Sequence, residues 1–363
     1  MIKRGLISGP SFFVDDSHSP ASRSQVARIC TFQQNRCRVG LETEPVCGNS
    51  SNARITSRGR HLSMASSEQS AAPGNSEVWT VQRILQWTTN FLQQKNVESP
   101  RVEAELLLAH ARNCNRIRLY ADFNEPLTDQ QRAQMRELVQ RRAAREPLAY
   151  IVGAREFYGR RFRVAPGVLI PRPETESLID CCLERLGSPT ERQLLEVGIG
   201  SGCISITLLL QKPTLRITAT EISTEAVAIA QANAADHNVT DRLNILAGNV
   251  LEPLTQQHGR QFHGLVSNPP YIRTDEMAEL APEIRKYEPE IALCSGADGL
   301  DVVRQIFQQA GALLADGAFL ALELDPSQCE SVAEMALQHG FRQPRIHRDA
   351  AGLKRIVEAE WGG

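Results

Sequence analysis

The fold is decided by the stretch Gln193-Leu-Leu-Glu-Val-Gly-Ile-Gly-Ser-Gly-Cys-Ile-Ser-Ile-Thr-Leu-Leu-Leu210. Its first five residues are mostly apolar and are typical of a short buried strand. Residues 198–202 contain three glycines and predict a tight turn, and the apolar run 203–210 predicts a helix. A strand, a glycine turn and a helix in this order form the first half of a strand–helix–strand unit.

The same alternation continues towards the C-terminus. Further strands are predicted at 215–220, 243–247, 264–267 and 318–324, and an alanine-rich helix at 224–237. Strands that alternate with helices indicate an α/β domain with a parallel, doubly wound sheet. Ligands of such sheets bind beyond the carboxyl ends of the strands, so the residues that follow each strand are the candidates for chemistry.

The glycine turn reads Glu196-x-Gly198-x-Gly200-x-Gly202, with Ile199 and Ser201 between the glycines. Glycines allow the backbone to approach a ligand closely. The pattern differs from the G-x-G-x-x-G turn that leaves a helix N-terminus free for a pyrophosphate. Glu221 ends the second strand, where its carboxylate is placed to accept hydrogen bonds from ribose hydroxyls. A purely structural turn remains the alternative for the glycines alone.

The second motif is Asn268-Pro269-Pro270-Tyr271, directly after the fourth strand. Two prolines stiffen the backbone and remove two N–H donors. We therefore expect the carbonyl of Pro269 and the side-chain oxygen of Asn268 to act as acceptors that face one point. That arrangement suits a planar –NH₂ group, which Tyr271 would stack against. Positioning such a weakly nucleophilic nitrogen is the main catalytic task that we predict here.

Together these motifs make the chain, from Val78 to Glu360, resemble the peptide-chain release factor glutamine N5-methyltransferases, within the class I S-adenosylmethionine-dependent methyltransferases. N-P-P-Y alone is shared with DNA adenine and RNA guanine methyltransferases, whereas the combination is specific. The resemblance is carried by Arg145–Tyr150, Gly153, Glu156-Phe157, Leu169-Ile-Pro-Arg-Pro-Glu-Thr-Glu176, Gly198–Gly202, Asn268–Tyr271, Tyr287-Glu-Pro289, Gly296-Ala-Asp-Gly-Leu300, Glu323 and Gly352.

The resemblance implies a seven-stranded domain that binds S-adenosylmethionine and a helical domain that helps to dock the substrate protein. It implies that the partner is a class 1 translation release factor, methylated on the glutamine of its Gly-Gly-Gln motif. Asn268 would bind the substrate amide, and Pro269, Pro270 and Tyr271 would shape the substrate slot. No nucleic acid, membrane or metal is expected to take part.

Four cofactor positions depart from the usual pattern of the family. Glu196 and Glu221 stand where Asp is common. Asn249 stands where an Asp usually binds the adenine amino group, although an Asn oxygen can accept the same hydrogen bond. Val250 offers an apolar face where an aromatic side chain often stacks on adenine. We expect these changes to affect cofactor affinity and not the type of reaction.

Parts of the sequence also fit three other functions. A glutamine methyltransferase that acts on a ribosomal protein has the same architecture, and the segment Ile170–Glu176 favours the release-factor branch. A nucleic-acid amino-group methyltransferase would need a basic recognition surface. The chain carries 40 Lys and Arg against 42 Asp and Glu, a formal net charge of −2, which disfavours such a surface. A non-catalytic binding module is disfavoured by the intact Asn268–Tyr271 motif.

A small helical domain is predicted before the α/β domain. Val78, Val81, Ile84, Leu85, Phe91 and Leu92 follow a helical period. Ser99-Pro100 predicts the start of a second helix, and Thr128-x-x-Gln131 predicts a capping box for a third. Residues 146–172 are predicted to form a β-hairpin and linker, after which Thr175 would cap the next helix. The predicted domains are therefore 1–75, 76–145, 146–172 and 173–363.

Residues 1–75 are predicted to lie outside the folded domains. Residues 1–65 hold nine Lys and Arg but four Asp and Glu, and the acidic residues disfavour a transit peptide. Met64 begins a stretch that resembles an ordinary protein start. The location is therefore predicted to be cytoplasmic, with a mitochondrial or plastid matrix as the alternative if residues 1–75 are a transit peptide. The six cysteines beyond residue 75 are predicted to be reduced thiols.

Overall fold

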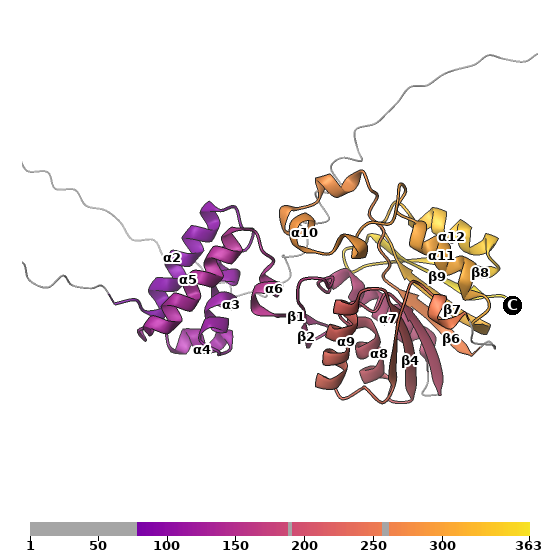
Figure 1. The fold of residues 1–363 in the computed structure, drawn as a ribbon, viewed down its shortest axis with the longest axis horizontal. Coiled ribbons are helices and arrows are strands. Elements are labelled where there is room, and N and C mark those ends of the chain that lie inside the picture. Colours follow the sequence, from indigo (N-terminus) through magenta and orange to yellow (C-terminus); the bar gives the residue numbers. More distant parts are fainter. Residues whose placement is uncertain (1–77, 188–190, 256–260) are drawn as a thin grey trace, which may run out of the picture. The chain divides into compact units, whose positions relative to one another are not determined.

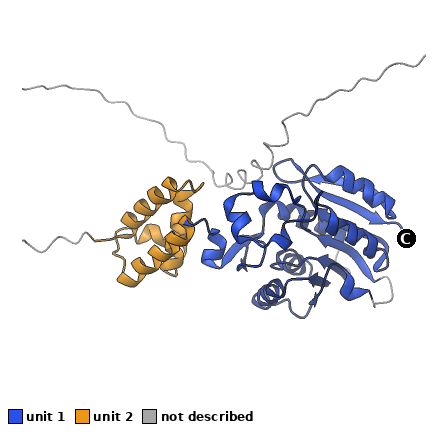
Figure 2. Ribbon diagram, turned by 45° about the horizontal axis from the view of Figure 1, so that its top comes forward, with its two compact units in different colours: residues 1–33, 144–363 blue, residues 34–143 orange. Residues whose placement is uncertain are grey.

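The computed structural model describes residues 78–187, 191–255 and 261–363, so the predictions for residues 1–75 lie outside the described part. The described chain divides into two compact units, coloured separately in Figure 2. We call residues 78–143 the helical unit and the described residues from 144 to 363 the sheet unit. The four predicted domain ranges remain a prediction. No helix in the described ranges is long and apolar enough to cross a membrane.

The helical unit contains α2 (Val81–Gln94), α3 (Pro100–Ala111), α4 (Arg116–Ala121) and α5 (Asp129–Ala143). The predicted capping box is confirmed, because Thr128 and Gln131 each accept a hydrogen bond from the backbone N–H of the other. Thr80 caps α2, so Val78 lies before the helix and not on its apolar face, and its side chain is exposed. Ser99 does precede α3, with Pro100 at its first position, but its side chain makes no capping hydrogen bond.

The predicted hairpin is confirmed within a shorter range. β1 (Ala154–Phe157) and β2 (Arg160–Arg163) pair antiparallel, joined by Tyr158 and Gly159 at positive φ. The residues before it form α6 (Leu148–Val152), which ends at Gly153 with φ 70°. The apolar residues 148–152 are therefore helical and not part of the alternating strand pattern, because Pro147 begins a helical turn there.

A seven-stranded sheet dominates the sheet unit (Figure 1). Its strands are β3 (Arg192–Val197), β4 (Leu215–Glu221), β5 (Leu243–Ala247), β6 (Phe262–Ser267), β7 (Leu314–Glu323), β8 (Phe341–Arg348) and β9 (Lys354–Trp361), in the order β5-β4-β3-β6-β7-β9-β8. Strands β3 to β7 are parallel, as predicted. The last two strands were not predicted individually, and they make the sheet mixed at one edge, because β9 pairs antiparallel with both β7 and β8. The turn between β8 and β9 is too short for a parallel crossover.

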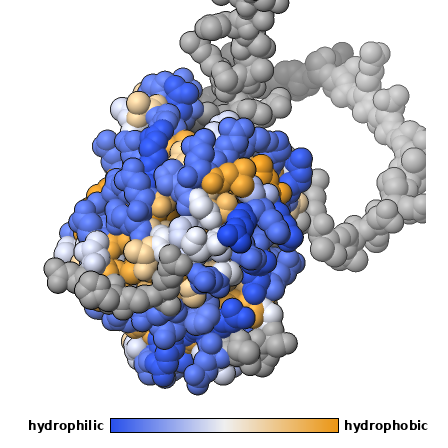
Figure 3. Space-filling model, turned by 90° about the vertical axis from the view of Figure 1, so that its right-hand side faces the viewer, coloured by the Kyte–Doolittle hydropathy of each residue, from blue (hydrophilic) through white to orange (hydrophobic). Residues whose placement is uncertain are grey.

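Helices cover both faces of this sheet. They are α7 (Glu176–Leu186), α8 (Cys203–Gln211), α9 (Thr224–Asp236), α11 (Asp301–Ala310) and α12 (Cys329–Gln338). The short helix α10 (Pro282–Tyr287) lies between β6 and α11 in the sequence and has no buried residue. Leu194 packs in the cluster under α7, α8 and α9, whereas Leu195 packs in the cluster under α11 and α12. Neighbouring strand residues thus enter opposite cores, which explains why the central strands are apolar throughout. On the face drawn in Figure 3 the described surface is mostly hydrophilic, with scattered apolar patches.

Thr175 does not cap α7. It closes a 3₁₀ turn, Pro173–Thr175, with helical backbone angles, and its side chain makes no capping hydrogen bond. A capping residue needs extended backbone angles to turn its side chain onto the first helical N–H groups. The prediction of a cap is therefore wrong, and the hydroxyl group is directed to other partners.

Candidate active site

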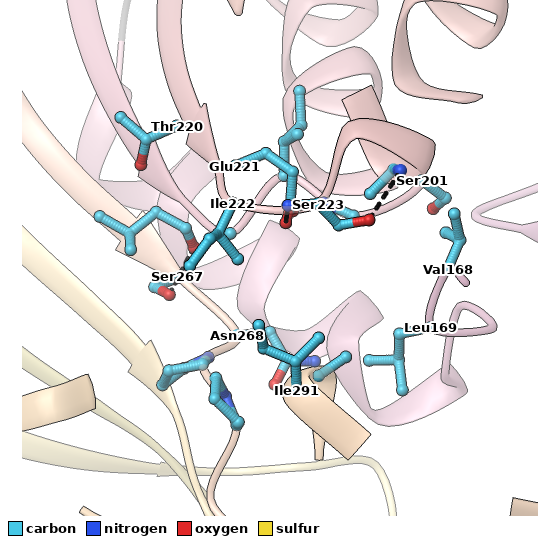
Figure 4. A pocket seen from close by; sticks show the side chains of 18 of the residues that line it. Val168, Leu169, Ser201, Thr220, Glu221, Ile222, Ser223, Ser267, Asn268 and Ile291 are labelled. Carbon is cyan, nitrogen blue, oxygen red and sulfur yellow. Dashed lines mark hydrogen bonds between the residues drawn. The ribbon is translucent and has the colours of Figure 1, made fainter. Parts of the chain in front are cut away.

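A pocket lies where the parallel strands end. Because β3 to β6 are parallel, the residues after Val197, Glu221, Ala247 and Ser267 meet at one edge of the sheet. Figure 4 shows Ser201, Glu221, Ser267 and Asn268 around this pocket, at or just after the ends of β3, β4 and β6. Of the predicted site residues, those that line it are Gly198, Ile199, Gly200, Ser201, Glu221, Asn249, Val250, Asn268, Pro269 and Pro270. Among the described residues, Glu196, Gly202 and Tyr271 lie outside the lining.

The glycine turn has the backbone that its composition predicts. Gly198, Gly200 and Gly202 have φ values of 74°, 54° and 81°, which side-chain-bearing residues rarely adopt. A Cβ added at Gly198 or Gly200 would meet nothing within 4 Å, whereas one at Gly202 would lie 2.8 Å from Ile206 Cδ1. The first two glycines therefore keep bare backbone beside the pocket, and the third permits close packing of α8.

Glu221 is held by the loops around it. Its carboxylate accepts backbone N–H bonds from Gly200 at 2.9 Å and from Ser223 at 2.9 Å. A carboxylate has about four acceptor positions. Two of them remain for ligand hydroxyls after these bonds are made, which agrees with the predicted role.

Glu196 lies behind the pocket wall. Its side chain is buried, and Oε2 accepts hydrogen bonds from the backbone and the hydroxyl of Ser205 in α8. Within the described residues, Oε1 has no hydrogen-bond partner. Burial raises the pKa of this carboxyl to about 8, against the opposing effect of the Ser205 hydrogen bonds. The carboxyl thus ties the end of β3 to α8, and direct contact with a cofactor remains a prediction.

Asn249 follows β5 and has a defined orientation. Its Nδ2 donates to Glu252 Oε1 at 3.3 Å and to Gln305 Oε1 at 3.1 Å. The amide oxygen is thereby left as the atom that can accept from a ligand amino group. Val250 beside it is buried with φ 46°, a strained angle for a β-branched residue. The adjacent Leu251 N–H donates to Gln309 of α11 at 3.2 Å, which helps to hold this turn.

Asn268 follows β6, and its Nδ2 donates to Thr175 Oγ1 at 3.1 Å. Pro269 and Pro270 line the pocket beside it. Burial raises the pKa of the Tyr271 hydroxyl, and the charge of Glu323 adds to this effect. The backbone carbonyl of Tyr271 accepts from Gln328 Nε2 at 3.0 Å. The proline loop is thus held at both ends by side chains distant in the sequence.

Other motifs noted in the sequence are tied to one another or to this loop. Glu288 bonds Arg172 at 2.5 Å and the backbone N–H of Ile170 at 3.2 Å, which ties residues 287–289 to the proline-rich segment. Gln328 also donates to the Asp298 carbonyl at 3.1 Å. A Cβ at Gly299 would lie 2.2 Å from the Tyr271 carbonyl oxygen. The glycine in this segment is therefore required by a close backbone approach.

Several pocket residues were missed by the sequence analysis. Ile222, Ile291 and Leu169 give the pocket apolar walls. Ile222 directly follows Glu221 and is half-exposed, so its place after a strand end was a usable signal. Thr175 also lines the pocket, but its position before a helix favoured a capping role. Gln305 carried no recognisable signal, because its contact with Asn249 spans 56 residues.

One described group, Cys181, His347 and Glu358, brings three possible metal-ligating atoms within 4.8 Å of one another. His347 Nε2 lies 2.7 Å from Glu358, and Arg185 lies 3.2 Å from the same carboxylate. Burial raises the pKa of the Cys181 thiol to about 12, so the thiol stays protonated at neutral pH. Since Arg185 already supplies a cation to Glu358, we interpret the group as an ion-paired cluster. That no metal takes part remains a prediction.

The pocket fits a nucleoside cofactor with an amino-acid tail. A carboxylate at the end of β4 suits ribose hydroxyls, and the open side of the glycine turn leaves backbone groups beside the tail. The Asn249 oxygen and the apolar side chains of Ile222 and Val250 suit an adenine ring with its amino group. These polar and apolar groups therefore fit S-adenosylmethionine.

The sheet order, the glycine turn and this pocket define a class I methyltransferase domain. Residues 83–153 match the model of the PrmC N-terminal domain, and residues 175–286 match that of the methyltransferase small domain. The chain is 42% identical over 286 residues to the release factor glutamine methyltransferase of Geobacter sulfurreducens, covering 79% of this chain and 98% of the relative. The chain belongs to the family of release factor glutamine methyltransferases.

Two further similarities were found. The release factor glutamine methyltransferase of Rhodopirellula baltica is 39% identical over 295 residues, covering 80% of this chain and 99% of that protein. A solved structure of the release factor-specific protein-(glutamine-N5) methyltransferase of Alicyclobacillus acidocaldarius is 27% identical. It aligns with 56% of this chain and 100% of its own chain, at a TM-score of 0.34.

Proposed function

We propose that this enzyme transfers the methyl group of S-adenosylmethionine to the side-chain amide nitrogen of the glutamine in the Gly-Gly-Gln motif of class 1 release factors. The supporting observation is the position of Asn268 in the same pocket as Glu221 and the glycine turn. The family relatives named above support this choice of substrate over a ribosomal protein or a nucleic acid. We propose the cytoplasm as its location.

The chain's own residues act mainly by positioning. S-adenosylmethionine, when bound, supplies an electrophilic methyl group. It would be held by the Glu221 carboxylate at the ribose, by the Asn249 oxygen at the adenine amino group and by the backbone of residues 198–201 at the amino-acid tail. The Asn268 oxygen and the Pro269 carbonyl would accept the two N–H groups of the glutamine amide. These acceptors stabilise the partial positive charge that develops on nitrogen during transfer, and the fixed geometry converts a weak nucleophile into an effective one.

Substrate choice can be tested by incubation with labelled S-adenosylmethionine. Purified class 1 release factor, ribosomal proteins, and DNA or RNA are offered in separate reactions, and the labelled residue is identified by mass spectrometry. We expect label on the Gly-Gly-Gln glutamine. Label only in ribosomal protein or nucleic acid would overturn the proposal.

The role of Asn268 is tested by two substitutions. Removal of one positioned acceptor at a developing charge costs about 10²–10³-fold in turnover, so Asn268→Ala should lose that much while its affinity for S-adenosylhomocysteine changes little. Asn268→Asp keeps acceptor oxygens and should retain more turnover than Ala. Single-turnover methylation with calorimetric titration measures both effects. Wild-type turnover in Asn268→Ala would remove this residue from the mechanism.

A further inference from the structure

Asn268 can act as an acceptor only if its amide is turned the right way. An Asn amide has an oxygen on one side and an –NH₂ group on the other, so a half-turn exchanges acceptor and donors. In the structure Nδ2 points to Thr175 Oγ1, at 3.1 Å. This contact leaves the Asn268 oxygen free to face the pocket. A half-turn of the amide would instead place its –NH₂ group there, so some neighbouring group must disfavour that orientation.

Thr175 is buried, with 2% of its surface exposed, and its hydroxyl group has a single proton. The Thr175 side chain also hydrogen-bonds the Glu323 carboxyl, which lowers the pKa of Glu323. When Glu323 is ionised it can only accept, so Thr175 must then be the donor. With its proton engaged, the Thr175 oxygen can only accept from Asn268. The direction of the first hydrogen bond therefore determines the direction of the second.

The sheet places Glu323 beside Asn268. Ser267, the last residue of β6, pairs with Leu322 of β7 in parallel register. Asn268 directly follows Ser267, and Glu323 directly follows Leu322, so the two residues lie next to each other at this end of the sheet. Glu323 is 1% exposed, and within the described chain its Oε2 has no hydrogen-bond partner. Burying an acidic side chain with one carboxyl oxygen left without a hydrogen bond costs free energy. Such a group is therefore a candidate for a functional role.

We propose, resting on the proposed function, that Thr175 and Glu323 are positioning residues that orient the Asn268 amide, with Glu323 accepting from Thr175 and Thr175 accepting from Asn268. The chain of hydrogen bonds presents the Asn268 oxygen to the substrate amide. Glu323 touches neither substrate nor cofactor in this scheme, and it acts through Thr175.

The scheme depends on the ionisation of Glu323. Burial raises the pKa of Glu323 to about 7, while Thr175, Arg355 and Arg172 oppose the rise and Glu174 adds to it. The other titratable groups that interact with this region are Tyr271, Cys203 and Asp325. An ionised carboxylate can only accept, whereas a protonated carboxyl can donate to Thr175 and permit the reversed amide. Turnover should therefore fall as the pH drops through about 7.

The test compares Thr175→Val, which keeps the shape and removes the hydroxyl, with Thr175→Ser, which keeps the hydroxyl. With a purified class 1 release factor as substrate, Thr175→Val should lower kcat by up to about 10²-fold. S-adenosylhomocysteine affinity should stay within about threefold, and Thr175→Ser should recover most of kcat. Equal kcat in all three proteins would overturn the proposal.

Two further measurements separate positioning from simple loss of packing. An Asp at position 268 presents an oxygen on both sides, so Thr175→Val should cost much less in the Asn268→Asp background than in the wild type. Glu323→Gln should abolish the fall of kcat below pH 7, because an amide does not titrate in that range. The proposal would be overturned if the effects of Thr175→Val and Asn268→Asp on kcat were additive. It would also be overturned if kcat of Glu323→Gln still fell below pH 7 as in the wild type. Failure of the wild type to methylate release factor would instead overturn the proposed function.

Discussion

Glu221 serves both the fold and the pocket with one carboxylate. Its bonds to Gly200 and Ser223 join the glycine turn to the end of β4, and its remaining acceptors are available to a ligand. The extra methylene relative to Asp extends its reach from the strand end. The departure from the usual residue is therefore compatible with the expected ribose contact.

We expect Glu221→Ala to weaken the binding of S-adenosylhomocysteine by about 1.5–3 kcal/mol, because hydrogen bonds to a charged acceptor are lost. Calorimetric titration measures this change, and circular dichroism checks the fold. Glu334→Ala removes an exposed acidic side chain from α12 and is the matched control. Unchanged affinity in Glu221→Ala would show that the strand-end carboxylate does not contact the cofactor.

Glu196 makes stability depend on pH. Its folded pKa of about 8 lies above the ordinary carboxyl value of 4.5, so between these values the folded state holds a proton that the unfolded state has lost. The free energy of unfolding should fall as the pH rises through this window, by at most about 1.4 kcal/mol per pH unit. Urea unfolding at pH 6 and pH 9 should show a smaller loss in Glu196→Gln than in the wild type. An identical loss in both would contradict the prediction.

At the scale of elements, the loops after β6 and before α11 are packed backbone against backbone. Gly299 has φ 76° and sits against the Tyr271 carbonyl, and Gln328 from the start of α12 bonds both loops. Two segments that are distant in the sequence, the loop before α11 and the residue before α12, thus hold the proline loop in place.

We expect Gly299→Ala to destabilise the protein by more than about 2 kcal/mol, since the left-handed backbone alone costs about 1–2 kcal/mol and the clash involves backbone that cannot move aside. Turnover should fall because the loop that carries Asn268 shifts. Gly317→Ala is a close control, with φ 74° but only the Glu360 side chain 4.0 Å away. Thermal unfolding and single-turnover rates compare the two. Equal effects would mean that strain alone, and not the Tyr271 contact, matters.

At the scale of the whole molecule, every residue that lines the pocket belongs to the sheet unit, between Gly167 and Val302. The sequence before Val78 shows no periodic apolar face, so its removal should expose no core. We expect a chain that begins at Ala72 to unfold at the same temperature and to methylate release factor at the same rate as the full-length chain. A loss of activity after this truncation would show that residues 1–71 contribute to catalysis.

The sequence by itself determined the α/β class, the succession of strands β3 to β7 along the chain and the strand ends at which Glu221, Asn249 and Asn268 lie. These features depend on local patterns, namely apolar runs, glycine turns and strand-end positions, and parallel strands bring their carboxyl ends together wherever they pair. The capping box at Thr128 and Gln131 was predicted for the same reason, since both partners lie within four residues.

Only the tertiary structure decided which partners these residues find. It added β9 antiparallel between β7 and β8, and it placed Glu196 behind the pocket. It also brought Asn268 within hydrogen-bond distance of Thr175, 93 residues away in the sequence. The hydrogen bond of a buried hydroxyl group depends on the groups that packing brings within about 3 Å, and no local pattern encodes that neighbourhood. The residues of this site could therefore be predicted from local sequence patterns, whereas the orientation of the Asn268 amide was decided by the fold.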